Sequence, residues 1–564
     1  MASAYGDTPQ GLFAQILNFA AILTRRLVLE VPRYQRPYSW NEQQVRQLIQ
    51  DLWRAFSRGA KFYFIGQIVL VKSKDGRLEI SDGQQRLATL TMIIAYVRDR
   101  LPNRTKHYQG LIMSGDQPRL RLRKNDSGFF RGYVQEVGNM AALAALDDTG
   151  IDSRNLMCAA ARTIADELGE TGDRELDAFM SFIARSATFN VVEADERGCA
   201  ATVYHTLNDR GLELNAADNL KCDLLENSGL RPEDADAAAS KWEELEDLLG
   251  RKRFGVLLNW TPFLLTGASL VSPDDLVEIR GAVDKMGGVR NFLFDHLQRY
   301  AEALSDIFNE DVNCGSATDN ADINRRLKMM KQVNRDWSRW LWLPPAIAFL
   351  AQPSGKPERA RRFFQALDRL TWACAYHEVD NRRQDIRFAR AMRGVGDDKA
   401  LYGPKGALEL TPKEHMSFVA RLNGPHGYGE SRRLLMLRLE AAMDGGSVLD
   451  IDADAGVEHV LPKKGGLWWN ERIPSVQLRK EYVNLLGNLV LVKHEQNQRA
   501  GNKDFPFKRD VFFNTKGAPV HAVTQDIAGI QEWTLDVIEA RQERLVRILC
   551  DDWDLMRGGA AQAA

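Results

Sequence analysis

The stretch Ile80-Ser81-Asp82-Gly83-Gln84-Gln85-Arg86-Leu87 has the pattern of a strand that ends, turns and continues as a helix. An apolar strand ends at Ile80, Asp82 and Gly83 favour a turn, and helical periodicity begins near Gln85. Free N–H groups at the start of such a helix, with Arg86 beside them, can bind an anion, and a phosphate of a nucleotide or of DNA is the natural occupant. The structural alternative is that Asp82 only caps the helix and Arg86 pairs with a surface acid.

Strand and helix patterns alternate around this junction over roughly the first 100 residues. The periodicity predicts helices over 9–23, 42–56 and 87–97, a strand over 27–31, and a hairpin of strands over 62–72 and 78–80. Helical periodicity dominates from 199 to about 400. Further on, 457–461 and 489–493 are strand-like segments between helices. We therefore expect an α+β fold, mostly helical overall, with domains over 1–230, 231–410 (a helical spacer) and 411–564.

The bulk composition limits the functional classes. The 564 residues are too many for one hydrophobic core. The formal net charge of -1 means that any DNA contact has to come from local basic patches. The six cysteines form no CxxC pair, which argues against a zinc ribbon or a disulfide scaffold. The N-terminus lacks signal-peptide character and the apolar runs are too short to span a bilayer, so we expect a cytoplasmic protein with no membrane partner.

Two more polar blocks and one basic segment accompany the junction. Residues 32–40 are PRYQRPYSW and residues 207–214 are LNDRGLEL. The alternation in 119–124, RLRLRK, predicts Arg119, Arg121 and Arg123 on one face of a strand, where they could follow phosphates or form a solvated basic edge. The chain has no P-loop motif.

The strongest catalytic pattern lies between 457 and 508. Glu458-His459 ends a predicted strand, and Asn488, Asn497, Asn502 and Lys508 follow it. An imidazole can take a proton from water at neutral pH, and a neighbouring carboxylate can hold Mg²⁺ or Mn²⁺ against a phosphate.

Two nearby features are given no catalytic part. His494 is expected to be structural. The acidic run Asp450, Asp452 and Asp454 imitates a calcium loop, but Ala455 and Leu461 stand where that loop requires Gly and Glu.

These blocks resemble the GmrSD family of type IV restriction enzymes at both ends of the chain. The N-terminal resemblance covers about 10–230, with DGQQR as the hallmark, and implies an α/β module related to the ParB/sulfiredoxin fold. The C-terminal resemblance covers about 430–555 and implies an HNH-type ββα-metal nuclease domain set among helices. Here Glu-His replaces the Asp-His of many HNH sites, and Asn497 replaces a His.

The resemblance implies a set of site residues in each module. Those for nucleotide or DNA binding are Tyr34, Gln35, Arg36, Asp82, Gly83, Gln84, Gln85, Arg86, Asn208 and Arg210. In the nuclease domain it implies His459 as general base, oriented by Asn488. Lys508 and Asn502 would contact phosphate, and Glu458, His459 and Asn497 would hold the metal.

The implied function is that of a modification-dependent endonuclease of phage defence, regulated by an NTP (GTP or another) and cutting or nicking modified double-stranded DNA with Mg²⁺ or Mn²⁺. A homodimer is expected, because cutting both strands with one HNH site per chain needs two chains or two events. Two alternatives stay open. One is a nucleotide-dependent DNA-binding regulator with a non-catalytic HNH fold. The other is a nuclease whose N-terminal module binds DNA and hydrolyses no NTP.

Overall fold

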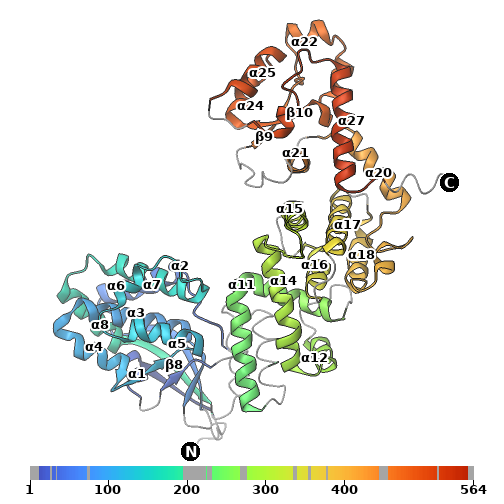
Figure 1. Cartoon of the computed structure of the whole chain (residues 1–564). Helices are drawn as coiled ribbons and strands as arrows, with labels where there is room; N and C mark the ends of the chain where they lie inside the picture. Colours follow the sequence, from blue (N-terminus) through green and yellow to red (C-terminus); the bar gives the residue numbers. More distant parts are fainter. Residues whose placement is uncertain are drawn as a thin grey trace, which may run out of the picture. The chain divides into compact units, whose positions relative to one another are not determined.

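The computed structural model divides the chain into two compact units (Figure 1). The first comprises Met1–Gly255 and Val283–Phe294, and the second Val256–Ala282 and Asp295–Ala564. The structure describes residues 12–25, 28–32, 35–72, 77–194, 224, 231–266, 276–333, 339–352, 357–376, 379–427, 429–443, 455–516 and 520–556. The fold is α+β and mostly helical, which confirms the expected class. The division into three domains stays a prediction.

A six-stranded mixed sheet forms the base of the first unit, in the order β1-β8-β3-β4-β2-β7. The strands are β1 (Leu12–Asn18), β2 (Leu29–Glu30), β3 (Tyr63–Lys72), β4 (Leu78–Asp82), β7 (Leu120–Arg121) and β8 (Ala187–Ala194). β3 lies parallel to β8 and antiparallel to β4, as expected for the two strands of a hairpin. A separate pair, β5 (Met113–Ser114) and β6 (Gln117–Pro118), is antiparallel.

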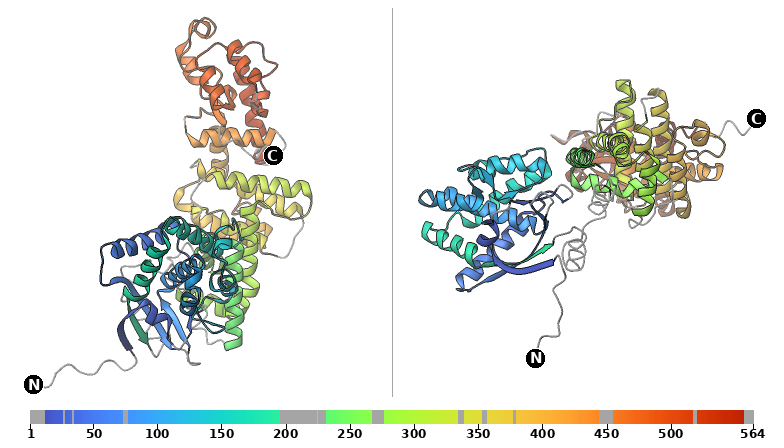
Figure 2. Two further views of the ribbon diagram at one scale, coloured as in Figure 1. Left: turned by 90° about the vertical axis from the view of Figure 1, so that its left-hand side faces the viewer. Right: turned by 90° about the horizontal axis from the view of Figure 1, so that it is seen from below.

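Helices cover one face of this sheet (Figures 1 and 2). They are α1 (Phe19–Leu23), α2 (Glu42–Ser57), α3 (Gln84–Arg100), α4 (Thr105–Ile112), α5 (Lys124–Phe130), α6 (Met140–Ala144), α7 (Asp152–Leu168) and α8 (Asp173–Ser186), with a 3₁₀ turn at Pro102–Arg104 and a π-helical turn at Arg131–Gln135. Along β3, Ile68 and Leu70 join the large helical core, whereas Val69 and Val71 form a small cluster with Ala194 on the opposite face. The central helix α3 is buried along nearly its whole length, so its first residues lie at a fixed place beside the end of β4.

The helix expected over 9–23 is wrong for most of its described length. Residues 12–18 form strand β1, and only 19–23 are helical. β1 pairs with β8 in the register Leu12↔Ala194 to Asn18↔Thr188. Such a distant partner leaves no mark in local periodicity, and a short apolar run fits either structure.

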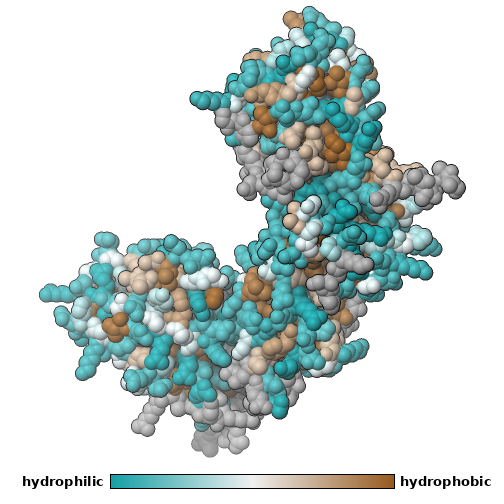
Figure 3. All heavy atoms as spheres, in the orientation of Figure 1, coloured by the Kyte–Doolittle hydropathy of each residue, from teal (hydrophilic) through white to brown (hydrophobic). Residues whose placement is uncertain are grey.

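The second unit begins within helix α11, and its described elements are helical up to the strand that starts at Ala455. Its spacer helices include α14 (Gln298–Asn309), α15 (Ala317–Val333), α16 (Leu343–Leu350), α17 (Pro357–Ala375), α18 (Asn381–Arg393), α19 (Asp398–Tyr402) and α20 (Pro412–Asn423). The preceding elements are α11 (Pro232–Thr266), α12 (Leu276–Lys285), α13 (Val289–Asn291) and the π-helical turn Phe292–Leu297. Among the described helices, none has the length and apolar character needed to cross a membrane. Hydrophilic residues cover most of the face shown in Figure 3.

The C-terminal part holds a two-stranded antiparallel sheet, β9 (Ala455–His459) and β10 (Leu489–Lys493), in which His459 lies opposite Leu489. Both strands were expected within two residues of these bounds. The helices are α21 (Glu430–Met443), α22 (Leu467–Arg472), α23 (Val476–Tyr482), α24 (His494–Ala500), α25 (Phe505–Asn514), α26 (Ala522–Gln525) and α27 (Leu535–Asp552), with a 3₁₀ turn at Leu486–Asn488. The order β9, β10, α24 is a β-β-α arrangement.

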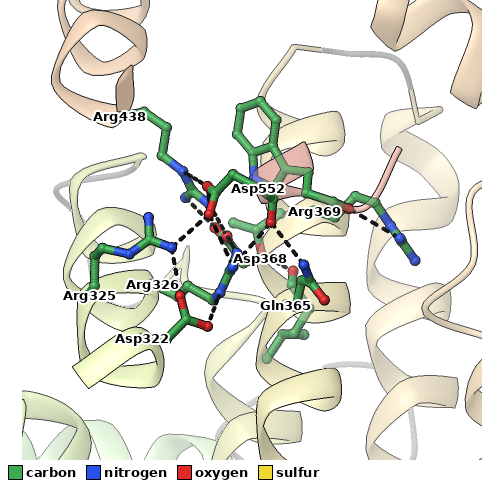
Figure 4. A network of polar contacts seen from close by, with 11 residues as sticks. Asp322, Arg325, Arg326, Gln365, Asp368, Arg369, Arg438 and Asp552 are labelled. Atoms are coloured by element: carbon green, nitrogen blue, oxygen red, sulfur yellow. Dashed lines mark hydrogen bonds and ion pairs between the residues drawn. The ribbon is translucent and has the colours of Figure 1, made fainter. Parts of the chain in front are cut away.

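A buried network of arginines and aspartates joins helices α21 and α27 to the spacer helices α15 and α17 (Figure 4). Arg438 of α21 donates to Asp368 of α17 at 2.9 Å and to Asp552 of α27 at 2.7 Å. Arg326 of α15 donates to Asp368 at 3.1 Å, and Arg325 reaches Asp552 at 2.6 Å. Asp322 accepts from both α15 arginines, so three acids balance three bases. Burial alone would raise the pKa of Asp552, but the charges of Arg438, Arg326 and Arg325 hold it well below its usual range.

Candidate functional site

The turn before α3 depends on a glycine. Gly83 has φ +95°, in the left-handed region, and a Cβ there would lie 2.8 Å from Ile68 Cγ1 and 3.2 Å from Gln67 O. Gly83 therefore lets β4 turn directly into α3 while β3 passes close by. The predicted junction of strand, turn and helix is confirmed.

The two glutamines of the junction hold the 35–39 segment in place. Gln84 Nε2 donates to Arg36 O at 3.0 Å and Gln85 Nε2 donates to Pro37 O at 3.0 Å. Gln85 Oε1 also accepts from Ser39 N at 2.8 Å, and Gln35 Nε2 donates to Ser81 O at 2.8 Å. The first two sequence blocks thus meet in space. Both amide atoms of Gln85 and the Nε2 of Gln84 bond to backbone of this segment, so the two glutamines shape the site.

Three charged groups remain at this junction: Arg36, Asp82 and Arg86. Burial raises the pKa of Asp82, although the nearby charges of Arg86 and Arg36 oppose the shift. Arg86 Nη1 donates to Gln67 O at 2.7 Å, and a Cβ at Gly66 would approach that nitrogen to 2.9 Å. Gly66 was not among the predicted site residues, since its only signal is a glycine inside a strand pattern. The expected site residues Tyr34, Asn208 and Arg210 lie outside the described residues.

The alternation in RLRLRK, which allowed either a phosphate track or a solvated basic edge, does not place its three arginines on one surface. Strand β7 covers only Leu120–Arg121, and Arg119 donates to the carbonyls of Gly110 and Leu23. Arg123 is 2% exposed and pairs with Asp126 at 2.8 Å, with further carboxylates of α11 near it. The alternating pattern misplaced Arg123, because this side chain is buried among carboxylates and does not reach the surface.

In the C-terminal part of the chain, Glu458 and His459 point to opposite faces of β9, since successive strand residues alternate. A Cβ at Gly456 would lie 3.5 Å from Asn497 Nδ2, so the face of Gly456 and Glu458 is covered by α24. His459 is on the other face, where Arg432 of α21 lies. The expected catalytic residues are therefore divided between two sides of one strand.

The imidazole of His459 lies among positively charged and polar groups. Arg432 Nη1 and Asn484 Oδ1 are each 3.3 Å from His459 Nε2. Burial, followed by the charge of Arg432, lowers the pKa of His459 to about 4. The ring is therefore neutral at physiological pH and able to accept a proton, as a general base must be.

On the opposite face, Lys508 of α25 forms a buried ion pair with Glu458. Its Nζ lies 2.7 Å from Glu458 Oε1 and 2.5 Å from His459 O. Lys508 is 0% exposed, so the expected direct contact with phosphate has no surface available in this arrangement. Its two bonds instead fix the end of β9. Asn502, the other expected phosphate contact, is exposed.

Asn488 holds the backbone that follows His459. Its Nδ2 donates to Leu461 O at 3.0 Å and Val483 O at 2.9 Å, while its Oδ1 accepts from Leu461 N at 2.7 Å and Trp533 Nε1 at 3.1 Å. All of its hydrogen-bonding capacity in the buried interior is thus used. Asn488 orients His459 through the chain, two residues away, and not through the ring.

Comparison with known families identifies both ends of the chain. Residues 13–225 match the family model for the GmrSD restriction endonuclease N-terminal domain, and residues 417–548 match that for the GmrSD restriction endonuclease C-terminal domain. This chain belongs to the GmrSD restriction endonuclease family. It is therefore a nuclease, and DNA is its substrate. A search of curated proteins gave no match.

The three metal ligands expected for this GmrSD-family enzyme fit only in part. Glu458 of β9 and Asn497 of α24, which covers the same face, offer the hard oxygen donors that Mg²⁺ or Mn²⁺ takes, but Glu458 Oε1 is already paired with Lys508 Nζ at 2.7 Å. Asn497 donates through Nδ2 to Val457 O at 3.4 Å, which leaves Oδ1 as the ligand atom. His459 lies on the other face, so the geometry gives it no place in this pair. Among the described residues, no three His, Cys, Asp or Glu side chains form a metal-binding group.

Two residues of the GmrSD-family nuclease site were missed in the sequence. Arg432 comes from α21, before β9, and Asn484 precedes the 3₁₀ turn that carries Asn488. Arg432 has no feature in the sequence that distinguishes it from the neighbouring arginines. Asn484 lies four residues before Asn488, a spacing that no catalytic pattern singled out.

Proposed function

We propose that this GmrSD-family nuclease is a type IV enzyme that hydrolyses a phosphodiester bond of modified DNA at His459, under the control of an NTP bound to its N-terminal module. The observation that carries the proposal is a neutral, buried imidazole at the end of β9 with the Arg432 guanidinium 3.3 Å away. A base and an anion-binding group so close together suit attack of water on a phosphate.

The chain's own residues supply most of the chemistry. His459 takes a proton from water while the water oxygen attacks phosphorus. The P–O bond to the leaving oxygen then breaks. Arg432 stabilises the charge that develops on the phosphate oxygens. A divalent cation held by Glu458 and Asn497 would supply further charge stabilisation when bound. Asn488 and Lys508 keep the end of β9 in position.

In the N-terminal module, Arg36 and Arg86 beside the start of α3 would bind the phosphates of the NTP. Their proximity is supported by the effect of both charges on Asp82. The NTP and the modified base would then favour one state of the enzyme over another, which regulation requires.

The catalytic part is tested by replacing His459 with Ala, with His494→Ala as the matched control. His494 is exposed on α24 and bonds only Gln498 among the described contacts. Cleavage of modified phage DNA with Mg²⁺ or Mn²⁺ should disappear in the first variant and persist in the second. Cleavage by His459→Ala at the native rate would remove His459 from the mechanism. If the wild-type enzyme bound DNA and never cut it, the regulator alternative would hold.

The regulatory part is tested by Arg86→Ala. Loss of this guanidinium should weaken NTP binding at least tenfold, because a charge-assisted hydrogen bond contributes about 1.5–3 kcal/mol. NTP binding and phosphate release, each measured with and without modified DNA, check this. Unchanged NTP affinity would move the nucleotide site elsewhere, and binding without phosphate release would indicate a sensor that does not hydrolyse NTP.

A further inference from the structure

The spacer carries a groove whose charged lining is entirely basic. Arg390 and Arg393 come from the end of α18, Lys399 from α19, and Lys405 from the loop after it. Gly394, Ala400, Gly403 and Pro404 complete the lining of a hollow of about 570 Å³. All four basic residues are exposed. The spacer contains none of the predicted site residues, so this concentration of charge needs an explanation.

The acids nearest in sequence, both among the described residues, form no ion pair with the basic residues of the groove. Asp397 Oδ1 accepts from the backbone N–H of Lys399 at 2.8 Å, and Asp398 pairs with Arg359 at 3.0 Å. Within the described part of the chain, no ion pair involves Arg390, Arg393, Lys399 or Lys405. Arg390 Nη2 donates to Lys405 O at 2.7 Å, which fixes the loop against α18. In a protein of net charge -1, four unneutralised cations in one place form a strong local positive field.

The lining indicates the kind of anion that fits. It contains no aromatic ring on which a base could stack and no carboxylate that could hold a ribose. Exposed lysines and arginines on different segments suit successive phosphates of a polymer, which lie close together along a duplex. A nucleoside triphosphate also carries phosphates, but it is shorter than a polymer whose phosphates follow one another along the groove.

We infer that this basic groove is a second DNA-contact surface, which holds the phosphodiester backbone while another segment of the same DNA enters the cutting site. The groove and His459 belong to the same compact unit. The inference rests on the proposed DNA cleavage and adds a contact that is independent of base sequence and modification. It gives the spacer a part in holding the substrate as well as in connecting the domains.

The test replaces Arg393, Lys399 and Lys405 with Gln in the full-length enzyme. Arg390 is kept because it fixes the loop. Binding of a fluorescein-labelled duplex is measured by anisotropy in EDTA, over a range of salt. Three lost phosphate contacts should make the slope of log affinity against log salt shallower by about 2.7, so that affinity varies about 40-fold less between about 50 and 200 mM salt.

A matched control, Lys252→Gln with Lys413→Gln, removes exposed charges outside the groove and should change the salt slope by less than the groove variant for each charge removed. Binding of a fluorescent NTP should be unchanged in the groove variant. A parallel loss of NTP binding would show that the groove holds nucleotide and would overturn the inference. If the groove variant binds DNA as the control does while the wild-type enzyme cuts modified DNA, the inference fails and the proposed function stands. If the wild-type enzyme neither binds nor cuts duplex DNA, both fail.

Discussion

Arg432 places a guanidinium 3.3 Å from His459 Nε2, and this contact affects the imidazole in two ways. Its positive charge, added to burial, keeps the ring unprotonated. The same N–H group can turn from the imidazole to a phosphate oxygen once DNA is present, because both are hydrogen-bond acceptors. At the scale of single residues, Arg432 is therefore as important to the proposed mechanism as His459 is.

Replacing Arg432 with Gln should lower kcat by about 100- to 1,000-fold, the usual cost of removing one donor from a developing oxyanion. Arg432→Lys should recover part of that loss, since it restores the charge without the planar fork. DNA affinity should change much less than kcat. Single-turnover cleavage and anisotropy on the same variants measure these effects, and Arg472→Gln, at an arginine that lies over Trp468, is the control. A native kcat in Arg432→Gln would exclude contact with the reacting phosphate.

At the scale of elements, helix α21 joins the surroundings of His459 to the buried arginine–aspartate network. Arg432 on this helix reaches the catalytic face of β9, and Arg438, further along it, enters the buried network with α15, α17 and α27. Glu440, near its end, accepts from Ala522 N at 2.8 Å and Val523 N at 2.9 Å at the start of α26. One helix therefore carries the Arg432 partner of His459, an arginine of the buried network and the carboxylate that accepts from the start of α26.

The network should make the enzyme acid-sensitive. The pKa of Asp552 is lower in the folded protein than the unfolded value of about 3.9, so its contribution is complete at neutral pH and is lost as pH falls below that value. Asp552→Asn should cost about 3–5 kcal/mol at pH 7, because Arg438 stays buried with an incomplete set of partners. It should also reduce the fall in thermal stability on acidification.

Thermal unfolding of the wild-type protein and of the Asp552→Asn variant over a pH series measures this effect. Asp319→Asn is the control, since Asp319 belongs to the same helix as Arg326 and, within the described part of the chain, pairs with Arg361 at 3.6 Å on the surface. If Asp552→Asn unfolds like the wild-type protein at pH 7, the network contributes no net stability.

At the scale of the whole molecule, the sequence predicted what depends on neighbours along the chain. Helix 42–56, the strands of the first hairpin, and the β9 and β10 strands have regular patterns, and the structure has them. The failures depend on distant partners. β1 was predicted as a helix because its partner β8 is far downstream, and Arg123 was predicted on a surface because its acids lie on α11.

In the candidate sites, too, the sequence predicted the features that depend on neighbours along the chain and missed those that depend on distant partners. Residue types and spacing marked Gly83, Arg86 and His459, but not the faces on which side chains lie. The separation of Glu458 from His459 follows from the strand they share, and the burial of Lys508 follows from the packing of α25. No pattern along the chain could have brought Arg432 to His459.

The arginine–aspartate network of Figure 4 also limits how such nucleases can exchange parts in evolution or in the laboratory. Its charges are shared: Arg326 and Asp368 come from the spacer, Arg438 and Asp552 from the cutting domain. A chimera joined between α20 and α21 would unite halves from different parents. Unless both parents carry the same charges at these positions, an ion would be left without its counterion in the interior, so this joint favours inheritance of spacer and cutting domain as one block.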